Sequence, residues 1–221
     1  MRIHHRTNVP DQTDVKIPVV PHIAIIHVEN DDRRPGEPTQ RAVVTVIFMR
    51  MMQRPPRPKT VLPAGAVVTR ERLTTDQYRA IYTEVGAPWL WWLRRVMPGH
   101  LLERHLASST VSVHLLRVGG EVAGFFELDA GHWPCVNLNY FGLLPRFIGR
   151  GLGKPLLDFA VDAVFEGATA LRGMSVNTCN ADHPRALPNY LAAGFVEYRR
   201  TREQWDIPLR LGFAIPEHLR G

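Results

Sequence analysis

The sequence predicts one mixed α/β domain whose strands are mostly antiparallel. Three strand-like segments follow one another between residues 110 and 144, separated only by short turns. Helical segments stand before and after them, which favours a sheet covered by helices over two packed sheets. The chain has 221 residues and 45% of them are hydrophobic, which is enough for one core and excludes a largely disordered protein.

Residues 1–60 differ from the rest of the chain. They hold eight of its 18 prolines and 10 of its 27 basic side chains, but only six of its 21 acidic ones. Pro-rich charged stretches favour extended linkers. We therefore expect residues 1–40 to be a basic leader, partly disordered or containing an edge strand over Ile23–Val28, and residues 41–221 to form the domain. The run Val43–Met51 predicts a strand that could extend the sheet or pair with a second copy.

A strand and three helical segments are expected first in the body of the domain. The strand begins near Ala66, and Thr74 or Thr75 is the N-cap candidate of the helix that follows it. Gly86 and Pro88 end this helix, and a second and a third helix follow Pro88 in close succession. The predicted order from residue 66 onward is β-α-α-β-β-β-α-β-α-β.

The later elements are bounded by clear turn and cap signals. Gly119-Gly120 predicts a two-residue hairpin turn. Apolar residues on one face predict an amphipathic helix over Gly151–Glu166. Asp182 is expected to cap a short helix that Gly194 closes in the left-handed conformation. The strands of this part are expected over residues 110–118, 121–129, 135–144, 170–178 and 195–207.

A glycine-rich segment stands between a strand and the amphipathic helix. Gly149, Gly151 and Gly153 would let the backbone approach an anion closely, and the helix dipole adds positive potential at the same place. The spacing matches neither the Rossmann fingerprint nor the P-loop. The glycines alone fit a pyrophosphate site and a turn without a ligand about equally well.

A second motif lies about 30 residues downstream, in the short helix that ends at Gly194-Phe195. Together the two motifs resemble the GNAT superfamily of acetyltransferases, and the resemblance covers residues 66–207. Two positions depart from the family pattern, because Ile148 stands at its Arg or Gln position and His183 at its Asn position. The matching positions are Gly151 and Gly153 in the loop, and Ala186, Tyr190, Gly194 and Phe195 in the helix.

The resemblance implies a twisted sheet with helices on both faces and two splayed central strands. It also implies direct transfer of an acetyl group from acetyl-CoA to an amine of a small molecule or a protein. Tyr190 would donate a proton to the leaving thiolate, or would only pack the last helix on the sheet. The backbone N–H of Leu143 would polarise the thioester carbonyl. Coenzyme contacts are implied for Leu143, Leu144, Gly149, Arg150, Gly151, Leu152, Gly153, Lys154, Asn180 and Tyr190.

The general base and the acceptor site are less defined. Glu127 lies among apolar residues, where burial would raise its pKa towards a useful value, or it lies on the polar side of its strand and has no such role. Asn137, Asn139 and Asn177 could instead hold a water that relays the proton. The rings of Trp89, Trp91 and Trp92, with Tyr78 and Tyr82, either line the acceptor site or pack the helices. Of these groups we assign Trp89, Trp92 and Asn139 to the acceptor.

Other classes of partner are not expected. His132 with Cys135, and Cys179 with His183, have the residue types of zinc ligands, but each pair is isolated and no metal is expected. Two cysteines fit a reducing cytoplasm. No run of 18 apolar residues and no signal-peptide core occur, so we expect no membrane partner. Residues 1–60 carry +4 of the net charge of +6, and the rest of the chain is close to neutral, so we expect no nucleic acid either.

An alternative to an enzyme is an acyl-CoA-binding regulatory or interaction module whose catalysis has decayed. Ile148 at the family's Arg or Gln position and the unassigned base both favour this alternative. Release of coenzyme A in the presence of amines separates the two hypotheses. A homodimer that pairs through Val43–Met51 is compatible with either.

Overall fold

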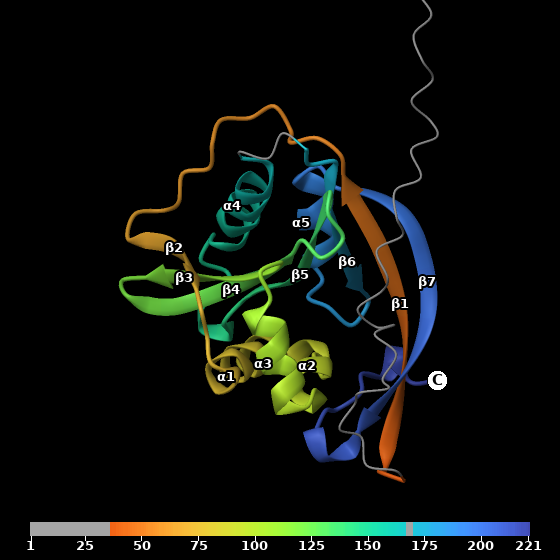
Figure 1. The fold of residues 1–221 in the computed structure, drawn as a ribbon. Coiled ribbons are helices and arrows are strands. Elements are labelled where there is room, and N and C mark those ends of the chain that lie inside the picture. The colour runs from red at the N-terminus through yellow and green to blue at the C-terminus, as the bar shows by residue number, and fades with distance from the viewer. Residues whose placement is uncertain (1–35, 167–169) are drawn as a thin grey trace, which may run out of the picture.

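The computed structural model describes residues 36–166 and 170–221. Its centre is a seven-stranded sheet with the strand order β2-β3-β4-β5-β6-β1-β7 (Figure 1). Neighbouring strands are antiparallel except β5 and β6, which run parallel. The predicted mixed α/β fold is confirmed. The strands are β1 (Thr39–Met51), β2 (Ala66–Glu71), β3 (Val111–Val118), β4 (Glu121–Asp129), β5 (Cys135–Leu143), β6 (Gly173–Cys179) and β7 (Val196–Pro208).

Helices lie on both faces of the sheet, with α4 and α5 on one side and α1, α2 and α3 on the other (Figure 1). In the described part of the chain, no helix has the length and apolar character needed to cross a membrane. The α-helices are α1 (Thr75–Gly86), α2 (Leu93–Val96), α3 (Gly99–Ala107), α4 (Gly153–Phe165) and α5 (Ala186–Ala192). Short 3₁₀ turns are η4 (Ala87–Trp89), η5 (Pro145–Phe147), η6 (Leu209–Leu211) and η7 (Glu217–Leu219).

Several local signals form the structures that they predict. Thr74 is the N-cap of α1 in a capping box, because its hydroxyl accepts from the backbone N–H of Gln77 while the Gln77 side chain accepts from the N–H of Thr74. Gly119 and Gly120 have φ values of 59° and 86° and close the hairpin between β3 and β4. Gly194, with φ of 100°, ends the last helical segment as expected.

Two helix starts differ from the prediction. After Pro88 the chain makes only a 3₁₀ turn, and α2 does not begin until Leu93, because Leu90 has a left-handed φ of 57° that interrupts the helix. Asp182 is not a helix cap, since α5 begins at Ala186 after the N-cap Arg185. The Asp182 carboxylate is bonded instead to groups at the end of β6.

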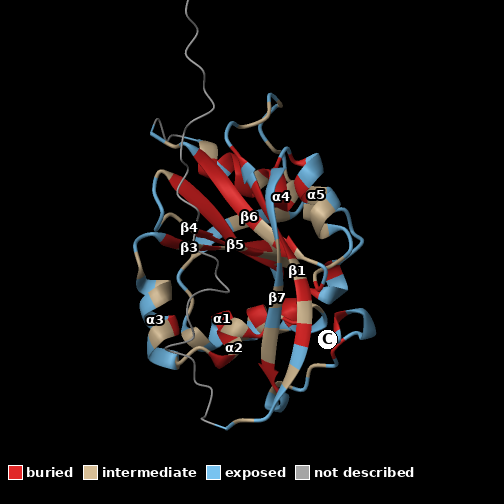
Figure 2. Cartoon of the chain, turned by 90° about the vertical axis from the view of Figure 1, so that its right-hand side faces the viewer, coloured by how far each residue is buried: buried red, intermediate tan, exposed pale blue. Residues whose placement is uncertain are grey.

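β1 lies inside the sheet, between β6 and β7, and pairs antiparallel with both strands. The predicted strand is confirmed, and of its two expected roles it takes the first, since it extends the sheet and both of its sides are paired within the chain. Ala42, Val44 and Val46 pack on α2 and the C-terminal segment, whereas Ile47 and Met49 face the main core. β7 is the exposed outer strand beside it (Figure 2). The strand expected over Ile23–Val28 lies outside the described residues.

The two parallel strands separate part of the way along their length. β5 and β6 are paired only from Cys135 and Gly173 to Leu138 and Val176. Beyond these pairs β5 continues to Leu143, still paired with β4, and β6 continues beside β1. The expected splay of the central strands is therefore present. It opens a gap in the sheet at the carboxyl ends of β5 and β6.

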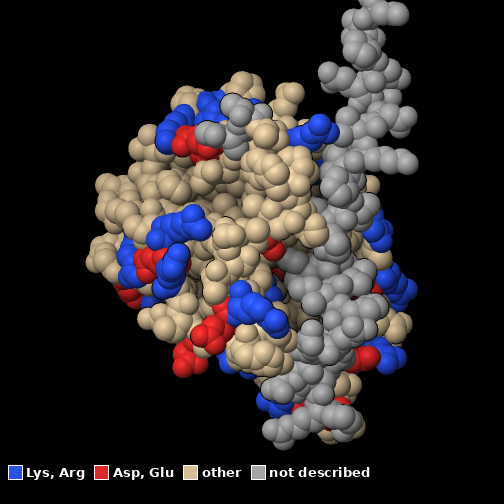
Figure 3. All heavy atoms as spheres, viewed as in Figure 1, with Lys and Arg blue, Asp and Glu red and all other residues tan. Residues whose placement is uncertain are grey.

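Several charged side chains of the described residues form ion pairs. On the face shown in Figure 3, Lys and Arg lie in small groups beside Asp and Glu. Ion pairs on the surface join Arg41 to Asp206, Lys59 to Glu166, Arg117 to Glu71, Arg146 to both Glu84 and Glu121, Arg200 to Glu197, and Arg210 to Glu37.

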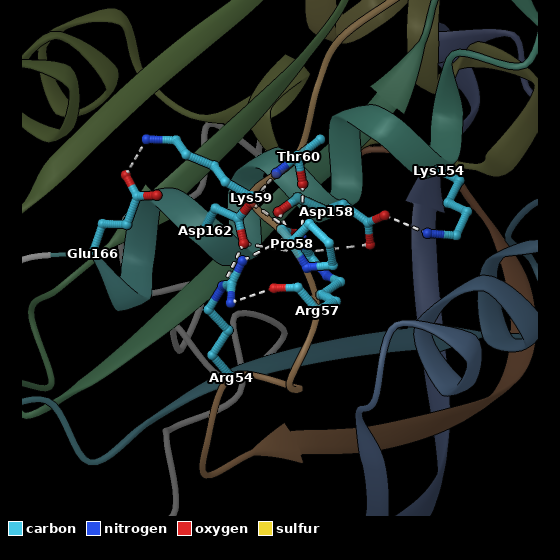
Figure 4. Close-up of polar contacts among 9 residues, drawn as sticks. All are labelled: Arg54, Arg57, Pro58, Lys59, Thr60, Lys154, Asp158, Asp162 and Glu166. Atoms are coloured by element: carbon cyan, nitrogen blue, oxygen red, sulfur yellow. Dashed lines mark hydrogen bonds and ion pairs between the residues drawn. The ribbon is translucent and has the colours of Figure 1, made fainter.

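The segment that connects β1 to β2 is fastened to α4 by a buried carboxylate (Figure 4). Asp162 accepts hydrogen bonds from Arg54 Nε at 2.7 Å, from Arg57 Nη1 at 3.1 Å and from the Thr60 backbone N–H at 2.8 Å. Its side chain is 3% exposed. Burial acts to raise the pKa of Asp162, but these hydrogen bonds outweigh it and hold the pKa well below its usual value. The carboxylate therefore fixes α4, whose N-terminus forms part of the site described below.

We expect Asp162→Asn to lower the free energy of unfolding by about 2 kcal/mol at pH 7, because two arginines lose their shared partner. The folded-state pKa is below the unfolded value of about 3.9, so this stabilisation is present above about pH 4 and is lost as pH falls through the folded-state pKa. Urea unfolding of wild type and variant at pH 7 measures this loss, and the difference between the two proteins should be smaller at about pH 2. The matched control is Glu166→Gln, which removes an exposed pair and should change stability by less than about 0.5 kcal/mol. An equal loss in both variants would contradict the prediction.

Candidate active site

A cavity of about 530 Å³ lies at the gap between β5 and β6. The glycine segment, the first turn of α4 and residues of α5 contribute one part of its lining. The rest comes from the ends of β5 and β6, from α1 and its connection to α2, and from single residues of β1 and β7. The splay of the sheet therefore places groups from most of the domain around one space.

The glycine segment forms an open backbone surface at the cavity. Gly149 and Gly151 have φ values of 82° and 74°, which side-chain-bearing residues rarely adopt. A Cβ at either position would meet no atom within 4 Å, so the space beside this backbone is open. No side chain of the described residues caps the N-terminus of α4, and Gly153 and Lys154 of its first turn line the cavity. Uncapped N–H groups at a helix N-terminus bind anions such as phosphate.

The basic side chains near this loop are engaged to different degrees. Lys154 lines the cavity and forms an ion pair with Asp158. Arg146 is bound by Glu84 and Glu121, and the Arg150 guanidinium lies 4.9 Å from the centre of the Phe147 ring. Neither arginine belongs to the cavity lining. Arg185 does, although sequence reasoning gave it no role, because it lies far from the glycines in the sequence.

The residues expected to contact a coenzyme fall into two groups. Leu144 is buried in the main core, and Arg150 and Asn180 also lie outside the lining. Asn180 instead fastens β6 to β1, since its Oδ1 accepts a 2.7 Å hydrogen bond from the Thr45 N–H. The residues that do line the cavity are Leu143, Gly149, Gly151, Leu152, Gly153, Lys154 and Tyr190.

The backbone of β5 offers hydrogen-bond donors to the cavity. The N–H of Leu144 donates to Ala123 of β4 at 2.9 Å. Backbone N–H groups of an antiparallel strand alternate in direction, so the N–H groups of Phe141 and Leu143 point away from β4. β6 does not pair with this part of β5. The Leu143 N–H therefore faces the gap in which the cavity lies.

Tyr190 of α5 presents a phenol to the same cavity. Its ring makes edge contacts with Phe141 and Phe195, at centroid distances of 6.3 and 5.9 Å. Among the described residues its hydroxyl has no hydrogen-bond partner. Burial, with the nearby Asp182 carboxylate adding to it, raises the pKa of Tyr190 well above its usual value. Tyr190 is therefore a protonated donor at neutral pH.

Glu127 is fully buried and lies outside the cavity lining. Its Oε1 contacts Arg94 Nη2 at 3.0 Å, His105 Nε2 at 2.9 Å and Asn139 Nδ2 at 2.7 Å, and its Oε2 accepts from the Tyr78 hydroxyl. Burial acts to raise its pKa, but Arg94, His105 and Tyr78 together hold the pKa of Glu127 well below its usual value. The expectation of a raised pKa is therefore wrong. This cluster could not be predicted from the sequence, because its members come from different elements.

Asparagines extend this cluster towards the gap. Asn139 lines the cavity, and its amide is held by contacts with Glu127 and Asn137. The Nδ2 of Asn137 donates to Asn139 Oδ1 at 2.6 Å. Ser175 of β6 donates to Asn137 Oδ1 at 2.8 Å. Asn177 also lines the cavity, whereas Asn137 does not. Asn139 is therefore a fixed polar group at the cavity wall.

All three tryptophans of the connection between α1 and α2 line the cavity. Trp91 packs against Tyr82 and Tyr140, at centroid distances of 5.4 and 5.1 Å. The Trp89 ring lies 5.0 Å from that of His183, and Trp92 is largely buried in the second core. These rings therefore pack the helices and also form a wall of the cavity.

Asp182 is a cavity residue that sequence reasoning placed elsewhere. Its Oδ2 accepts from Thr178 Oγ1 at 2.7 Å and from the Cys179 N–H at 2.8 Å, and its Oδ1 accepts from Trp91 Nε1 at 3.4 Å. Burial raises its pKa, although the hydrogen bonds that it accepts act in the opposite direction. An acidic residue just after a strand looks like a helix cap, so only the fold shows that it faces the cavity.

The cysteines stand far apart. Cys135 lies opposite Gly173 at the start of β6, whereas Cys179 is its last residue. Both are free thiols. Within residues 36–166 and 170–221, no group of three or more His, Cys, Asp or Glu residues is arranged to hold a metal ion.

The site thus combines a split parallel strand pair with a helix N-terminus that no described side chain caps. A family model described as "Acetyltransferase (GNAT) family" matches residues 73–195, more than half of the chain. The protein therefore belongs to the GNAT acetyltransferase family. A comparison with curated protein sequences found no significant match.

Solved structures support the same fold. The GCN5-related N-acetyltransferase of Sphaerobacter thermophilus is similar with a TM-score of 0.53 and 16% identity, over 76% of this chain and 53% of that one. A tandem GNAT protein from the clavulanic acid biosynthesis pathway is similar with a TM-score of 0.54 and 15% identity, over 77% of this chain and 55% of that one. The GCN5-related N-acetyltransferase of Kribbella flavida has a TM-score of 0.51 and 15% identity, over 76% of this chain and 60% of that one. This chain thus spans between half and two-thirds of the length of these structures, and at such identities the likeness concerns the fold.

Proposed function

We propose that this protein is an acetyl-CoA-dependent N-acetyltransferase that transfers the acetyl group directly to an amine. The observation that carries the proposal is the hydroxyl of Tyr190, which bonds to no other residue in the described part of the chain. Tyr190 lines the same cavity as Leu143 and the first turn of α4. Membership of the GNAT family supports acetyl transfer as the reaction class. The free thiols of Cys135 and Cys179 fit the reducing cytoplasm, where we propose that it acts.

The chain's own groups fit such a coenzyme. The N–H groups of Gly151, Gly153 and Lys154 would bind the pyrophosphate beside the open glycine backbone. Acetyl-CoA supplies an acyl group on a thiol that can leave. The Leu143 N–H would donate to the thioester carbonyl oxygen as negative charge develops there. The Tyr190 hydroxyl would donate to the sulfur as the carbon–sulfur bond breaks.

We do not assign proton abstraction to Glu127. A carboxylate with a lowered pKa, an ion pair with Arg94 and three further contacts is a weak base, and it does not line the cavity. Its contact with Asn139 instead fixes the direction of that amide at the cavity wall. Glu127 would thus be a positioning residue for Asn139.

The direct test measures binding and turnover separately. Calorimetry with acetyl-CoA should show binding below millimolar concentration, and a thiol reagent should detect release of coenzyme A over a panel of amines. The absence of binding at millimolar ligand would refute the proposal. Binding without release would favour the second candidate, a catalytically decayed acyl-CoA-binding module. The half-exposed Ile148 at the cavity, where the family has Arg or Gln, is the observation that supports that candidate.

We expect Gly151→Ala to weaken acetyl-CoA binding about tenfold. A side chain at a φ of 74° strains the loop, and its Cβ projects into the open space that the pyrophosphate would occupy. Gly212→Ala is the matched control, because Gly212 has a φ of 69° and open space but lies outside the cavity lining. Calorimetry on both variants provides the comparison. Equal affinity in the two variants would show that the loop does not bind the coenzyme.

A further inference from the structure

Asp182 is the only carboxylate among the described residues that line the cavity. It comes from the connection between β6 and α5, and its charge raises the pKa of the neighbouring Tyr190. The cationic side chains of the same lining are Lys154, bound to Asp158, and Arg185 of the α5 N-terminus. The Asp182 region is therefore the part of the cavity with negative charge.

The two oxygens of Asp182 are used unequally. Oδ2 accepts two good hydrogen bonds, from Thr178 Oγ1 and from the Cys179 N–H. Oδ1 accepts only one long contact of 3.4 Å, from Trp91 Nε1. No Lys, Arg or His of the described residues forms an ion pair with this carboxylate, although a carboxylate removed from water is stabilised chiefly by a cation. Oδ1 is thus fixed in direction and has acceptor capacity to spare.

The Trp91 ring, which contacts Asp182, is held firmly. Trp91 contacts Tyr82, Tyr140 and Phe125, and a Cβ on Gly86 would approach the Trp91 Cβ to 2.2 Å, so the indole passes directly over the backbone of α1. Trp89 and Trp205 add further indoles to the same lining. Indole faces bind apolar groups and also attract cations. A carboxylate beside such rings is complementary to an ammonium group on an apolar body.

We propose that the acceptor is an amine carried on an aromatic or other apolar body, and that Asp182 Oδ1 binds its ammonium group beside the Trp91 ring. The inference rests on the proposed function, since it names the substrate class of the same site. It assigns Asp182 the selection of cationic acceptors. Acceptors with a carboxylate next to the amine would be repelled by the same charge.

The test is a binding measurement without acetyl-CoA, so that no reaction can take place. Calorimetry compares three probes with the same phenethyl body: phenethylamine as the cation, phenethyl alcohol as the neutral probe, and phenylpropionate as the anion. The wild type should bind phenethylamine at least tenfold more tightly than the alcohol and should not bind phenylpropionate. Asp182→Asn should remove at least tenfold of the preference for the amine. Asp206→Asn, which removes an exposed carboxylate of β7, should retain it.

Each outcome has a defined meaning. Equal binding of amine and alcohol by the wild type, or an unchanged preference in Asp182→Asn, overturns the inference. The wild-type comparison of the three probes stands even if Asp182→Asn does not fold, and melting temperature and acetyl-CoA affinity verify that variant. Selective binding of phenethylamine without any coenzyme A release supports the ammonium site and contradicts the transferase. Coenzyme A release with unselective probe binding supports the transferase and overturns the ammonium site.

Discussion

Tyr190→Phe lowers the turnover number at least 100-fold and leaves the affinity for acetyl-CoA unchanged, if the phenol donates to the leaving sulfur. The ring contacts of Tyr190 with Phe141 and Phe195 involve carbon atoms, so phenylalanine retains them. Among the described residues the hydroxyl bonds to no protein group, and its removal leaves no partner unsatisfied. The variant therefore removes the proton donor alone, and general acid catalysis by one group contributes 10²–10⁴-fold.

Steady-state rates with saturating amine and calorimetry with acetyl-CoA measure the two quantities. The control is Tyr198→Phe, which removes a phenol from the outer strand β7, outside the cavity lining. Turnover within twofold of the wild type in Tyr190→Phe would leave the ring a packing role only. A weaker coenzyme affinity with unchanged turnover would instead make the hydroxyl a coenzyme contact.

The elements that sequence reasoning located best are those whose signals are local. The Thr74 capping box, the Gly119-Gly120 turn and the glycine segment before α4 depend on residues within a few positions of one another. The position of β1 within the sheet does not depend on such local residues. Its run of apolar, β-branched residues predicts a strand, but the partners β6 and β7 are about 130 and 160 residues away in the sequence. A strand pattern carries no information about which neighbours the strand will have.

The site shows the same distinction. Gly151 and Tyr190 were found because motifs mark them, and both line the cavity. Asp182 was interpreted as a helix cap, since residue type and position after a strand favour that role, and only its contact with Trp91 reveals the cavity. Glu127 was interpreted from its apolar neighbours alone. The pKa of Glu127 is lowered by Arg94 and His105, which lie 33 and 22 residues away in the sequence.

The cluster around Glu127 is where we expect the largest effect on stability. Arg94 and Glu127 have side chains that are 2% and 0% exposed, and their closest N–O distance is 3.0 Å. Removal of one partner of such a pair leaves the other charge buried and uncompensated, which costs about 3–5 kcal/mol. We therefore expect Glu127→Gln to lower the free energy of unfolding by about 3–5 kcal/mol at pH 7. The double variant Glu127→Gln/Arg94→Met should be more stable than Glu127→Gln alone, because no unpaired arginine remains.

The pH dependence of the same variant provides a second test. The folded-state pKa of Glu127 lies below its unfolded value of about 4.3, so its stabilisation is present above about pH 4.3 and is lost as pH falls through the folded-state pKa. The stability difference between wild type and Glu127→Gln, measured by urea unfolding, should shrink on acidification. A difference that does not change between pH 7 and pH 3 would contradict the charged pair.

Turnover of the same variant then separates a positioning role from a base. Under conditions where Glu127→Gln is folded, loss of a general base should lower kcat at least 100-fold and remove the acidic limb of the pH profile, on which the rate rises as the base loses its proton. If Glu127 only holds Asn139, glutamine can still accept its hydrogen bond, and kcat should fall less than tenfold with an unchanged pH profile. Asn139→Ala serves as the comparison, since it removes the group that faces the cavity. A larger loss of kcat in Asn139→Ala than in Glu127→Gln would place the functional contact at Asn139 and leave Glu127 the buried anion that orients it.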